Sequence, residues 1–358
     1  MVYYIGIKEK ETLNALGKAP ADINRICRHL GFKKIAVSAF PADRSFFYKK
    51  LWLVFSYIPM WISLLVKIKK DDKVLIQHPV HGVRIAVFAV PAIKRIKKCE
   101  FIVLIHDLES IRLGANGLSR SDKKRTDIAD GQLLRMYDKL ICHNEKMQIK
   151  LVEKGFNKSI IYTLGIFDYL TPFKPSVGNK GKNPSVVIAG NLQREKSEYI
   201  YRLISDNINT GLMVNLYGKG FDKEFESKYC IYHGSFIADD LPGRLSGDFG
   251  LVWDGTAIDT CTGNTGEYLR YNNPHKLSLY IAAGIPVIIW DKAAMADFVK
   301  ENGIGITVSG LEDLYMIIKN ISDERYREMS ENAVLLSKRI RNGRYTRDVF
   351  KACGLLEI

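Results

Sequence analysis

The chain has 358 residues, of which 47% are hydrophobic, and this length is typical of two domains that each bury a core. Its six cysteines are scattered without a CxxC pair or metal-type spacing, which argues against a disulfide-stapled or zinc-stabilised domain and indicates reduced packing residues. The net charge of +14 lies entirely in the first half: residues 1–170 carry 30 Lys and Arg against 16 Asp and Glu, whereas residues 171–358 carry 23 of each.

The chain starts without the pattern of a secretory signal, because residues 1–7 form a short run that leads directly into charged residues. We therefore expect a cytosolic protein. Short β-branched runs then alternate with helix-length segments, which is typical of a parallel sheet covered on both faces. The expected strands of the first half are residues 34–39, 73–77, 101–106 and 139–142.

An apolar segment, residues 51–66, carries no charge and lies between Lys49-Lys50 and the basic residues 67–70. It is shorter than the about 20 residues of a transmembrane helix, and Pro59 would kink it. Two interpretations stay open: a helix buried in the first domain, or a helix in the membrane interface with lysines at the headgroups. A second basic run, residues 94–98, extends the same basic surface. The charge asymmetry fits an anionic membrane or a nucleic acid.

A break in regular structure is predicted at residues 171–184, which contain three prolines and two glycines. The charge balance also changes there, so we place the domain boundary near residue 172. The expected strands of the second half are residues 185–189, 213–217, 231–233, 249–253, 286–290 and 305–308. The tail, residues 323–353, has the pattern of a helix.

The polar stretch of residues 263–276 follows an apolar run that ends at Asp254, and it leads into a helix-compatible segment. A polar loop at a strand's carboxyl end that opens a helix is where α/β sheets bind phosphates. Asn273 and Pro274 suit a helix start, and Lys276 in the first turn opposes the helix dipole unless an anion lies between them. The alternative is a capped helix with a solvated lysine.

Several motifs carry a family resemblance. They are Gly250-Leu251-Val252-Trp253-Asp254-Gly255, Gly266-Glu267-Tyr268-Leu269, Asn272-Asn273-Pro274-His275-Lys276, His106-Asp107-Leu108-Glu109-Ser110 and Ala189-Gly190-Asn191-Leu192. With them the chain resembles the bacterial β-1,6-galactofuranosyltransferases of O-antigen assembly. It is similar, more distantly, to the glucosyltransferases that extend sugars on serine-rich streptococcal adhesins.

The resemblance covers most of the chain and implies an α/β protein of the GT-B fold, in which two Rossmann-like domains face each other across a cleft. It implies that residues 1–171 form the acceptor-binding domain and residues 185–339 the nucleotide-sugar-binding domain. Residues 340–358 are expected to form a terminal helix that packs back on the N-terminal domain.

In a GT-B protein the nucleotide is held at the carboxyl ends of the second-domain strands, where Arg and Lys contact phosphate. The nucleotide-binding residues that the resemblance implies are Asn191, Arg194, Lys196, Tyr217, Gly218, Asn273, Lys276 and Ser278. The alternative is a set of helix starts with solvent-facing basic residues. Glu267 is expected to hold the ribose or the sugar, or else to pair with Arg270. Gly17 and Lys18 are expected in a loop that closes over the donor.

An acceptor hydroxyl needs a general base near the anomeric carbon. Asp107 is our candidate and His106 the second choice, because both follow the strand-like residues 101–105. The alternative is that Asp107 caps the following helix. The spacing of Asp254 and Asp259 suggests a metal, but the resemblance implies that basic side chains and helix amides stabilise the leaving diphosphate. We therefore expect no metal, and no cofactor besides the UDP-sugar donor substrate.

The resemblance thus predicts an inverting transferase that moves a hexose, above all galactofuranose, from a UDP-sugar to a sugar hydroxyl of a lipid-linked glycan. Its expected location is cytoplasmic and peripheral to the inner face of the cell membrane, whose anionic surface is an expected partner. A homo-oligomer is compatible with the sequence, and no nucleic-acid-binding motif is present. Two alternatives stay open: a glucosyl- or galactosyltransferase acting on a protein-linked glycan, or a non-catalytic GT-B partner subunit.

Overall fold

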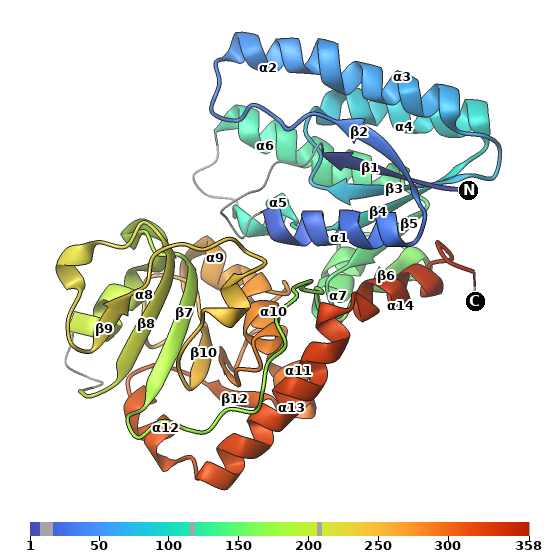
Figure 1. Cartoon of the computed structure of the whole chain (residues 1–358). Helices are drawn as coiled ribbons and strands as arrows, with labels where there is room; N and C mark the ends of the chain where they lie inside the picture. Colours follow the sequence, from blue (N-terminus) through green and yellow to red (C-terminus); the bar gives the residue numbers. More distant parts are fainter. Residues whose placement is uncertain (8–16, 115–118, 206–209, 358) are drawn as a thin grey trace. The chain divides into compact units, whose positions relative to one another are not determined.

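The computed structural model describes residues 1–7, 17–114, 119–205 and 210–357. They form two compact units, shown in sequence colours in Figure 1. The first unit is built on residues 20–164 and takes in the N-terminal strand and the chain from Thr346 onward. The second unit is built on residues 165–345 and takes in Lys18 and Ala19. The division therefore lies at residue 164, ahead of the expected boundary near residue 172.

The first unit contains a six-stranded parallel sheet in the order β2-β1-β3-β4-β5-β6. The strands are β1 (Val2–Ile7), β2 (Lys33–Val37), β3 (Lys73–His78), β4 (Glu100–Ile105), β5 (Lys139–Cys142) and β6 (Ile161–Thr163). In β4, the side chains from Phe101 to Leu104 have no exposed surface, because helices cover both faces of a parallel sheet. Figure 1 shows α1 on one face and α3 and α4 on the other.

The helices of this part of the chain connect the strands in turn. They are α1 (Lys18–His29), α2 (Phe46–Trp52), the π-helical turn η2 (Leu53–Tyr57), α3 (Ile58–Lys67), α4 (Val83–Lys97), α5 (Glu109–Arg112), α6 (Arg120–Thr126), the π-helix η3 (Asp127–Leu133), the 3-10 turn η4 (Leu134–Met136), α7 (Glu145–Glu153) and the 3-10 turn η5 (Lys158–Ile160). The segment expected at residues 51–66 lies within the continuous helical run of α2, η2 and α3.

The second unit contains another six-stranded parallel sheet, in the order β12-β11-β10-β7-β8-β9. The strands are β7 (Ser185–Asn191), β8 (Met213–Lys219), β9 (Cys230–Tyr232), β10 (Phe249–Val252), β11 (Val287–Trp290) and β12 (Gly305–Val308). Counted from β7, this is the Rossmann order 3-2-1-4-5-6, in which the chain reverses direction between the first and fourth strands. The switch point is therefore between β7 and β10.

The helices of the second unit complete its α/β alternation. They are α8 (Arg194–Ser205), the 3-10 turns η6 (Lys223–Phe225) and η7 (Leu241–Gly243), α9 (Gly263–Tyr268), α10 (His275–Ala282), α11 (Ala296–Glu301), α12 (Leu314–Asn320) and α13 (Asp323–Arg341). A large apolar core lies between the sheet and these helices, with Trp253 and Trp290 fully enclosed.

The C-terminal tail is two helices, so the expectation of one helix over residues 323–353 was wrong. The chain breaks at Gly343, whose φ of +70° is a left-handed conformation that favours glycine. Helix α13 stays in the second unit, and α14 (Arg344–Ala352) leads the chain into the first. There Phe350 stacks on Phe32 at 5.9 Å between ring centroids, and Lys139 donates to the Cys353 carbonyl at 2.9 Å.

Three further local expectations differ from the structure. The stretch of residues 263–276 is not a continuous loop, because α9 occupies its first half. Strands β1 and β6 had not been expected. Helix α10 begins at His275, with Pro274 as its N-cap residue, so Asn273 does not cap it. Of the loop expected around Gly17 and Lys18, residues up to 16 lie outside the described chain, whereas Lys18 is already the first residue of α1.

Candidate active site

The switch point of the second unit is a split between two neighbouring strands. Strands β7 and β10 pair only at Val186 with Phe249 and at Val187 with Gly250. Beyond that point the Tyr280 hydroxyl lies between them: it accepts from the Ala189 amide at 2.9 Å and donates to the Leu251 carbonyl at 3.4 Å. Open α/β sheets bind ligands outside the carboxyl ends of the strands at such a point. The geometry therefore puts the candidate nucleotide site between the ends of β7 and β10.

Lys276 lies at this split, in the first turn of α10. Its ammonium group donates to the Trp253 carbonyl at 2.7 Å and to Asp254 at 2.9 Å, directly after β10. The side chains of Lys276 and Asp254 are 16% and 18% exposed, so the ion pair is mostly buried but still reaches the solvent. An ammonium group has three N–H bonds, and the two described acceptors use two of them. One donor is left for an anion at the start of α10.

Helix α10 is held in this place by a glycine in the strand beneath it. A Cβ atom added at Gly250 would lie 2.2 Å from the ring of Tyr280, so only glycine lets α10 approach β10 this closely. The motif that contains Gly250 therefore serves to position the helix start, and with it Lys276.

Asn273 and Ser278, expected to bind nucleotide, are used within the protein. Asn273 is 4% exposed and donates to the Gly165 carbonyl at 3.0 Å. Ser278 is 1% exposed and donates to the Phe167 carbonyl at 2.7 Å. Both side chains fix α10 to the segment that begins the second unit. Of the three residues expected to bind nucleotide around the start of α10, only Lys276 therefore keeps a donor for a ligand.

Asn191, Arg194 and Lys196 lie together where β7 passes into α8. Asn191 is exposed, and its side-chain oxygen accepts from the Gln193 amide at 2.9 Å, which shapes the turn. Arg194 opens α8 with 57% of its side chain exposed, and Lys196 is exposed in the same turn. Their cationic groups reach the solvent beside the switch point, as a phosphate contact requires.

Gly218 and Tyr217 lie at the end of the next strand, β8. Gly218 pairs with Gly190 of β7, and a Cβ atom at Gly218 would be 1.8 Å from the Gly190 carbonyl oxygen. Tyr217 is buried: its ring stacks on His233 at 4.5 Å between centroids, and its hydroxyl accepts from the Ser246 amide at 3.1 Å. Burial raises the pKa of Tyr217. This tyrosine supports the loops after β8 and β9 and exposes almost no surface to a ligand.

Glu267 lies on α9 and forms the alternative pair, with Arg270 at 2.7 Å. Its side chain is 59% exposed, and the Arg270 guanidinium covers the Trp290 ring at 4.6 Å. The pair is on the surface, so it contributes little to stability and can be rearranged by a ligand.

Lys18 is buried in the second unit, with 2% of its side chain exposed. Its ammonium group pairs with Asp239 at 2.8 Å and lies 4.7 Å from the centre of the Tyr169 ring. Lys18 therefore forms a structural ion pair and is not accessible to a sugar. Gly17 immediately precedes α1 and begins the described part of the segment.

The first unit gathers polar side chains at the carboxyl ends of β3 and β4. The Gln77 amide donates to Asn24 at 2.9 Å and its oxygen lies 2.6 Å from Nε2 of His106. Because Gln77 presents its oxygen to the ring, Nε2 of His106 carries the proton that it donates. The carboxylate of Asp107 lies 3.8 Å from Arg112 and is 36% exposed. Asp107 therefore sits at an exposed strand end, where the sequence predicted it.

A buried pair that sequence reasoning missed lies beside it. His78 has no exposed surface, and its Nε2 atom is 2.9 Å from Asp130 in η3. The other oxygen of Asp130 accepts from the Ser110 amide at 2.6 Å. Burial acts to raise the pKa of Asp130, but the hydrogen bond and charge of His78 outweigh it and the pKa is lowered. His78 follows a strand-like run, a place that suits either an acceptor contact or a turn, and no local pattern pairs it with Asp130.

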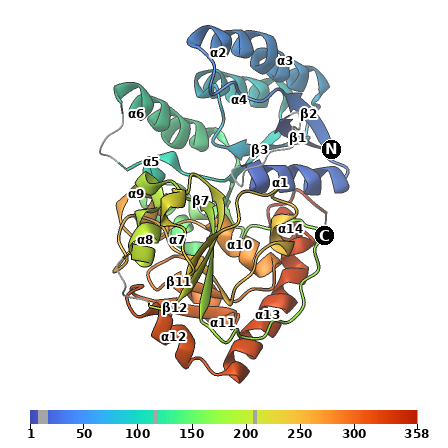
Figure 2. The same cartoon turned by 60° about the vertical axis from the view of Figure 1, so that its left-hand side comes forward.

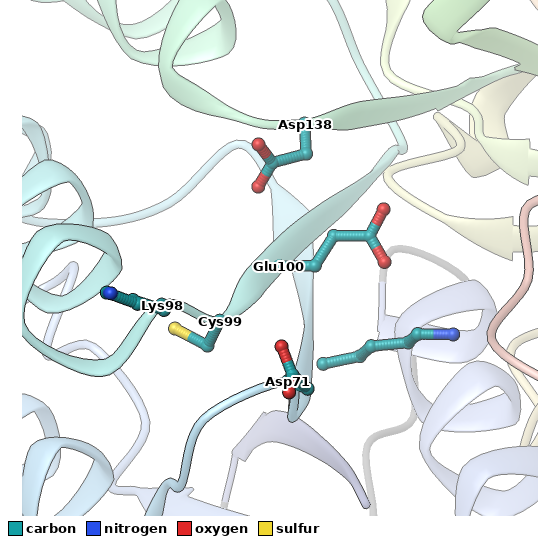
Figure 3. Close-up of a pocket in the computed structure, with 6 residues that line it drawn as sticks. Asp71, Lys98, Cys99, Glu100 and Asp138 are labelled. Atoms are coloured by element: carbon teal, nitrogen blue, oxygen red, sulfur yellow. The ribbon is translucent and has the colours of Figure 1, made fainter.

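An open cavity of about 380 Å³ lies at the other end of the first sheet, where strands β3, β4 and β5 begin. Figure 3 shows Glu100 and Asp138 on its walls, and both carboxylates are already paired, with Lys139 and Lys94 at 2.7 Å each. Amino ends are not where α/β sheets hold ligands. Among the described residues, no group of three or more His, Cys, Asp or Glu is placed to hold a metal ion.

Two family models together match most of the chain. Residues 1–164 match the description "Glucosyltransferase 3-like, N-terminal domain", and residues 186–353 match "Glucosyltransferase 3-like, C-terminal domain". The chain belongs to the glucosyltransferase 3-like family. Beta-1,6-galactofuranosyltransferase WbbI of Escherichia coli (strain K12) is 36% identical over 265 residues, 72% of each protein. Glucosyltransferase 3 of Streptococcus gordonii is 24% identical over 92% of this glycosyltransferase and 91% of its own length.

Solved structures of glycosyltransferases share the fold of the whole chain. The apo form of the lipopolysaccharide outer core galactosyltransferase WaaB has a TM-score of 0.63 at 11% identity and covers both chains completely. The Anabaena protein HepE, solved in complex with UDP, has a TM-score of 0.60 at 11% identity and covers 99% of this chain and 100% of its own. The chain therefore has the GT-B fold, with one Rossmann-like domain in each unit. The expected fold class is confirmed.

Proposed function

We propose that this glycosyltransferase moves galactofuranose from UDP-galactofuranose to a sugar hydroxyl of a lipid-linked glycan, with inversion at the anomeric carbon. The observation that carries the proposal is the 36% identity, over 72% of both proteins, to a relative named beta-1,6-galactofuranosyltransferase. A second candidate is glucosyl or galactosyl transfer to a protein-linked glycan. It is favoured by the relative named glucosyltransferase 3, which matches over 92% of the chain.

The donor diphosphate would lie at the split between β7 and β10. Lys276 offers its third N–H bond there, and the partial positive charge at the start of α10 favours an anion in the same place. Arg194 is exposed at the neighbouring helix start. The UDP bound by the structurally similar HepE supports a uridine nucleotide as the donor carrier.

The reaction would be a single displacement. The acceptor oxygen forms a bond to the anomeric carbon while the bond from that carbon to the β-phosphate oxygen breaks, and UDP leaves with the electron pair. Asp107 takes the proton of the acceptor hydroxyl, as a general base must. Lys276, Arg194 and the helix amides offset the charge that develops on the diphosphate, so the proposed mechanism requires no metal.

The donor site is tested by nucleotide binding to the purified full chain. We expect UDP and UDP-sugars to raise the melting temperature, and GDP and dTDP to leave it unchanged, since a ligand of the folded state adds RT ln(1 + [L]/Kd) of stability. Lys276→Ala should weaken UDP binding about 10- to 100-fold, the value of one charge-assisted hydrogen bond. Lys300→Ala is the matched control, because Lys300 is an exposed lysine elsewhere in the second unit.

A transfer assay with different donors then identifies the sugar that the enzyme uses. Incubation with UDP-galactofuranose, UDP-galactopyranose or UDP-glucose and an alkyl-linked glycan should give product from the first donor, unaffected by EDTA, with NMR showing the inverted anomeric configuration. Product from UDP-glucose or UDP-galactopyranose alone would favour the sugar of the second candidate, and a protein-linked glycan offered as acceptor would test the rest of it. UDP binding without turnover on any acceptor would identify a non-catalytic GT-B subunit instead.

A further inference from the structure

An exposed apolar stripe runs along the helical segment formed by α2, η2 and α3. From Phe55 onward its members follow each other at spacings of three or four, which places them on one side of a helix, and Phe47 lies eight residues before Phe55. They are Phe47, Phe55, Ile58, Ile62 and Val66, with exposed fractions of 65%, 75%, 38%, 55% and 74%. Monomeric soluble proteins rarely leave such a row of large apolar side chains in water, so this face calls for a partner.

The opposite side of the same segment is built into the first unit. Trp52, Tyr57, Met60, Trp61 and Leu64 are all buried there, and the Trp52 ring nitrogen donates to the Ser38 carbonyl at 2.9 Å. By length and composition, Phe46–Lys67 could cross a membrane, with a mean hydropathy of 1.3. If this segment crossed a membrane, its buried side chains would have to leave the core of the first unit. If it lies parallel to a membrane surface, the core stays intact.

Helix α4, which packs beside α3, also exposes large apolar side chains. It contacts α3, and Figures 1 and 2, seen from two directions, both show it alongside α2 and α3. Phe88 and Ile96 are exposed by 76% and 64% on this helix, and Arg84 and Arg95 are exposed beside them. Two adjacent helices thus present apolar side chains mixed with basic ones.

The charge around this surface has one sign. Residues 44–70 contain six Lys or Arg and residues 82–99 contain five, and neither segment contains an Asp or Glu. An anionic surface gains about fivefold in affinity for each basic residue close to it. A second copy of the same face would instead bring like charges together as its apolar residues met, which opposes self-association.

We propose that the α2–α4 face, defined by Phe47, Phe55, Ile62, Val66 and Phe88 with the flanking lysines and arginines, docks on an anionic phospholipid bilayer. The apolar side chains enter the interface between headgroups and acyl chains, and the basic side chains stay at the headgroups. The face is on the unit that carries Asp107, so docking would bring a lipid-linked acceptor to the membrane-bound enzyme. That consequence rests on the proposed function, whereas docking itself does not.

The test is flotation of the full chain with phosphatidylglycerol-containing vesicles and with pure phosphatidylcholine vesicles. We expect binding to the anionic vesicles that falls steeply with salt. Phe55→Asp with Ile62→Asp should lower binding at least tenfold, and Lys69→Gln with Lys70→Gln about 25-fold. Leu335→Asp is the matched control, because Leu335 of α13 is also 64% exposed but lies in the second unit. UDP binding by the same variants should equal that of the unaltered chain.

Two results would overturn the proposal. One is vesicle binding that the α2–α4 substitutions leave unchanged. The other is a stable dimer in sizing experiments that Phe55→Asp with Ile62→Asp converts to monomer, which would make a second copy the occupant. A Phe55→Cys chain with a polarity-sensitive fluorophore gives a direct readout, because all six native cysteines are buried. Its emission should shift on adding anionic vesicles, and an unshifted emission would contradict insertion whether or not sugar transfer has been demonstrated.

Discussion

Asp107 and His106 are adjacent in sequence, and the structure gives them different neighbours. His106 is tied through Gln77 to Asn24, so its ring is held by a chain of hydrogen bonds that begins in α1. Asp107 has 36% of its side chain exposed, and its carboxylate lies 3.8 Å from Arg112. A base must reach the proton that it removes, and this favours Asp107 over His106.

If Asp107 is the base, Asp107→Asn should lower kcat by about 100- to 10,000-fold, because the amide cannot accept the proton at neutral pH. The affinity for UDP should stay within about twofold, since Asp107 belongs to the first unit and the β7–β10 split to the second. Steady-state kinetics and calorimetry on the same preparation separate the two effects. Asp43→Asn, an exposed carboxylate in the same unit, is the control. Near-normal turnover by the Asp107 variant would remove this residue from the catalytic role.

At the scale of the element, the ends of β7 and β8 are joined through two glycines. Gly190 and Gly218 have φ values of +142° and +147°, where other residues are strained, and they are register partners. Gly218→Ala would place a methyl group 1.8 Å from the Gly190 oxygen. We expect a loss of about 1 to 3 kcal/mol in unfolding free energy and weaker UDP binding, because both strand ends must move apart.

Denaturant unfolding and calorimetry with UDP measure these two effects. Gly131→Ala in η3 is a suitable control, since a Cβ atom there meets nothing within 4 Å, and replacing glycine inside a helix stabilises by up to about 1 kcal/mol. A Gly218→Ala chain as stable as the unaltered one would mean that the two strand ends tolerate separation.

The order of strands and helices could be predicted because each strand is a short β-branched run with its own turn signals. Strands of three residues carry little pattern, so that β9 was expected and β6 was not, and α9 was missed because Gly263 and Gly266 look like loop residues. Residue roles were harder to predict. Lys276 lies where the helix-start pattern put it, but Asn273 and Ser278 of the same motif bind the carbonyls of Gly165 and Phe167. These partners are more than 100 residues away in sequence, so no local pattern reveals them.

At the scale of the whole molecule, the two units divide charge and chemistry. The half of the chain that carries the excess of basic residues also carries the α2–α4 face, whereas the neutral half carries the candidate nucleotide site. A basic second half would bind nucleotides and anionic lipids alike, which would confuse the two sites. Under the two proposals above, this separation of charge would let one unit meet a membrane while the other selects its donor through a few placed groups.

Each unit also holds one histidine that is kept neutral. Burial lowers the pKa of His143, in the first unit, to about 4. Burial and the nearby Lys18 ammonium lower the pKa of His275, in the second unit, to about 3. His275 is partly exposed as a residue, but its Nε2 atom is enclosed. In the unfolded chain both rings take up a proton near pH 6.5.

The unfolded state therefore binds more protons than the folded state as the pH falls from about 6.5 toward 4, and stability that is fully present above pH 6.5 is lost across that window. At pH 5 the loss should be about 2 kcal/mol for each histidine. Denaturant unfolding at pH 7.5 and 5.0, at fixed ionic strength, measures it. His143→Gln and His275→Gln should each remove about half of these two residues' share of the pH dependence, whatever they do to stability at pH 7.5. If the two substitutions left the difference in unfolding free energy between pH 7.5 and 5.0 unchanged, the rings would be protonated in the folded enzyme as readily as in the unfolded chain.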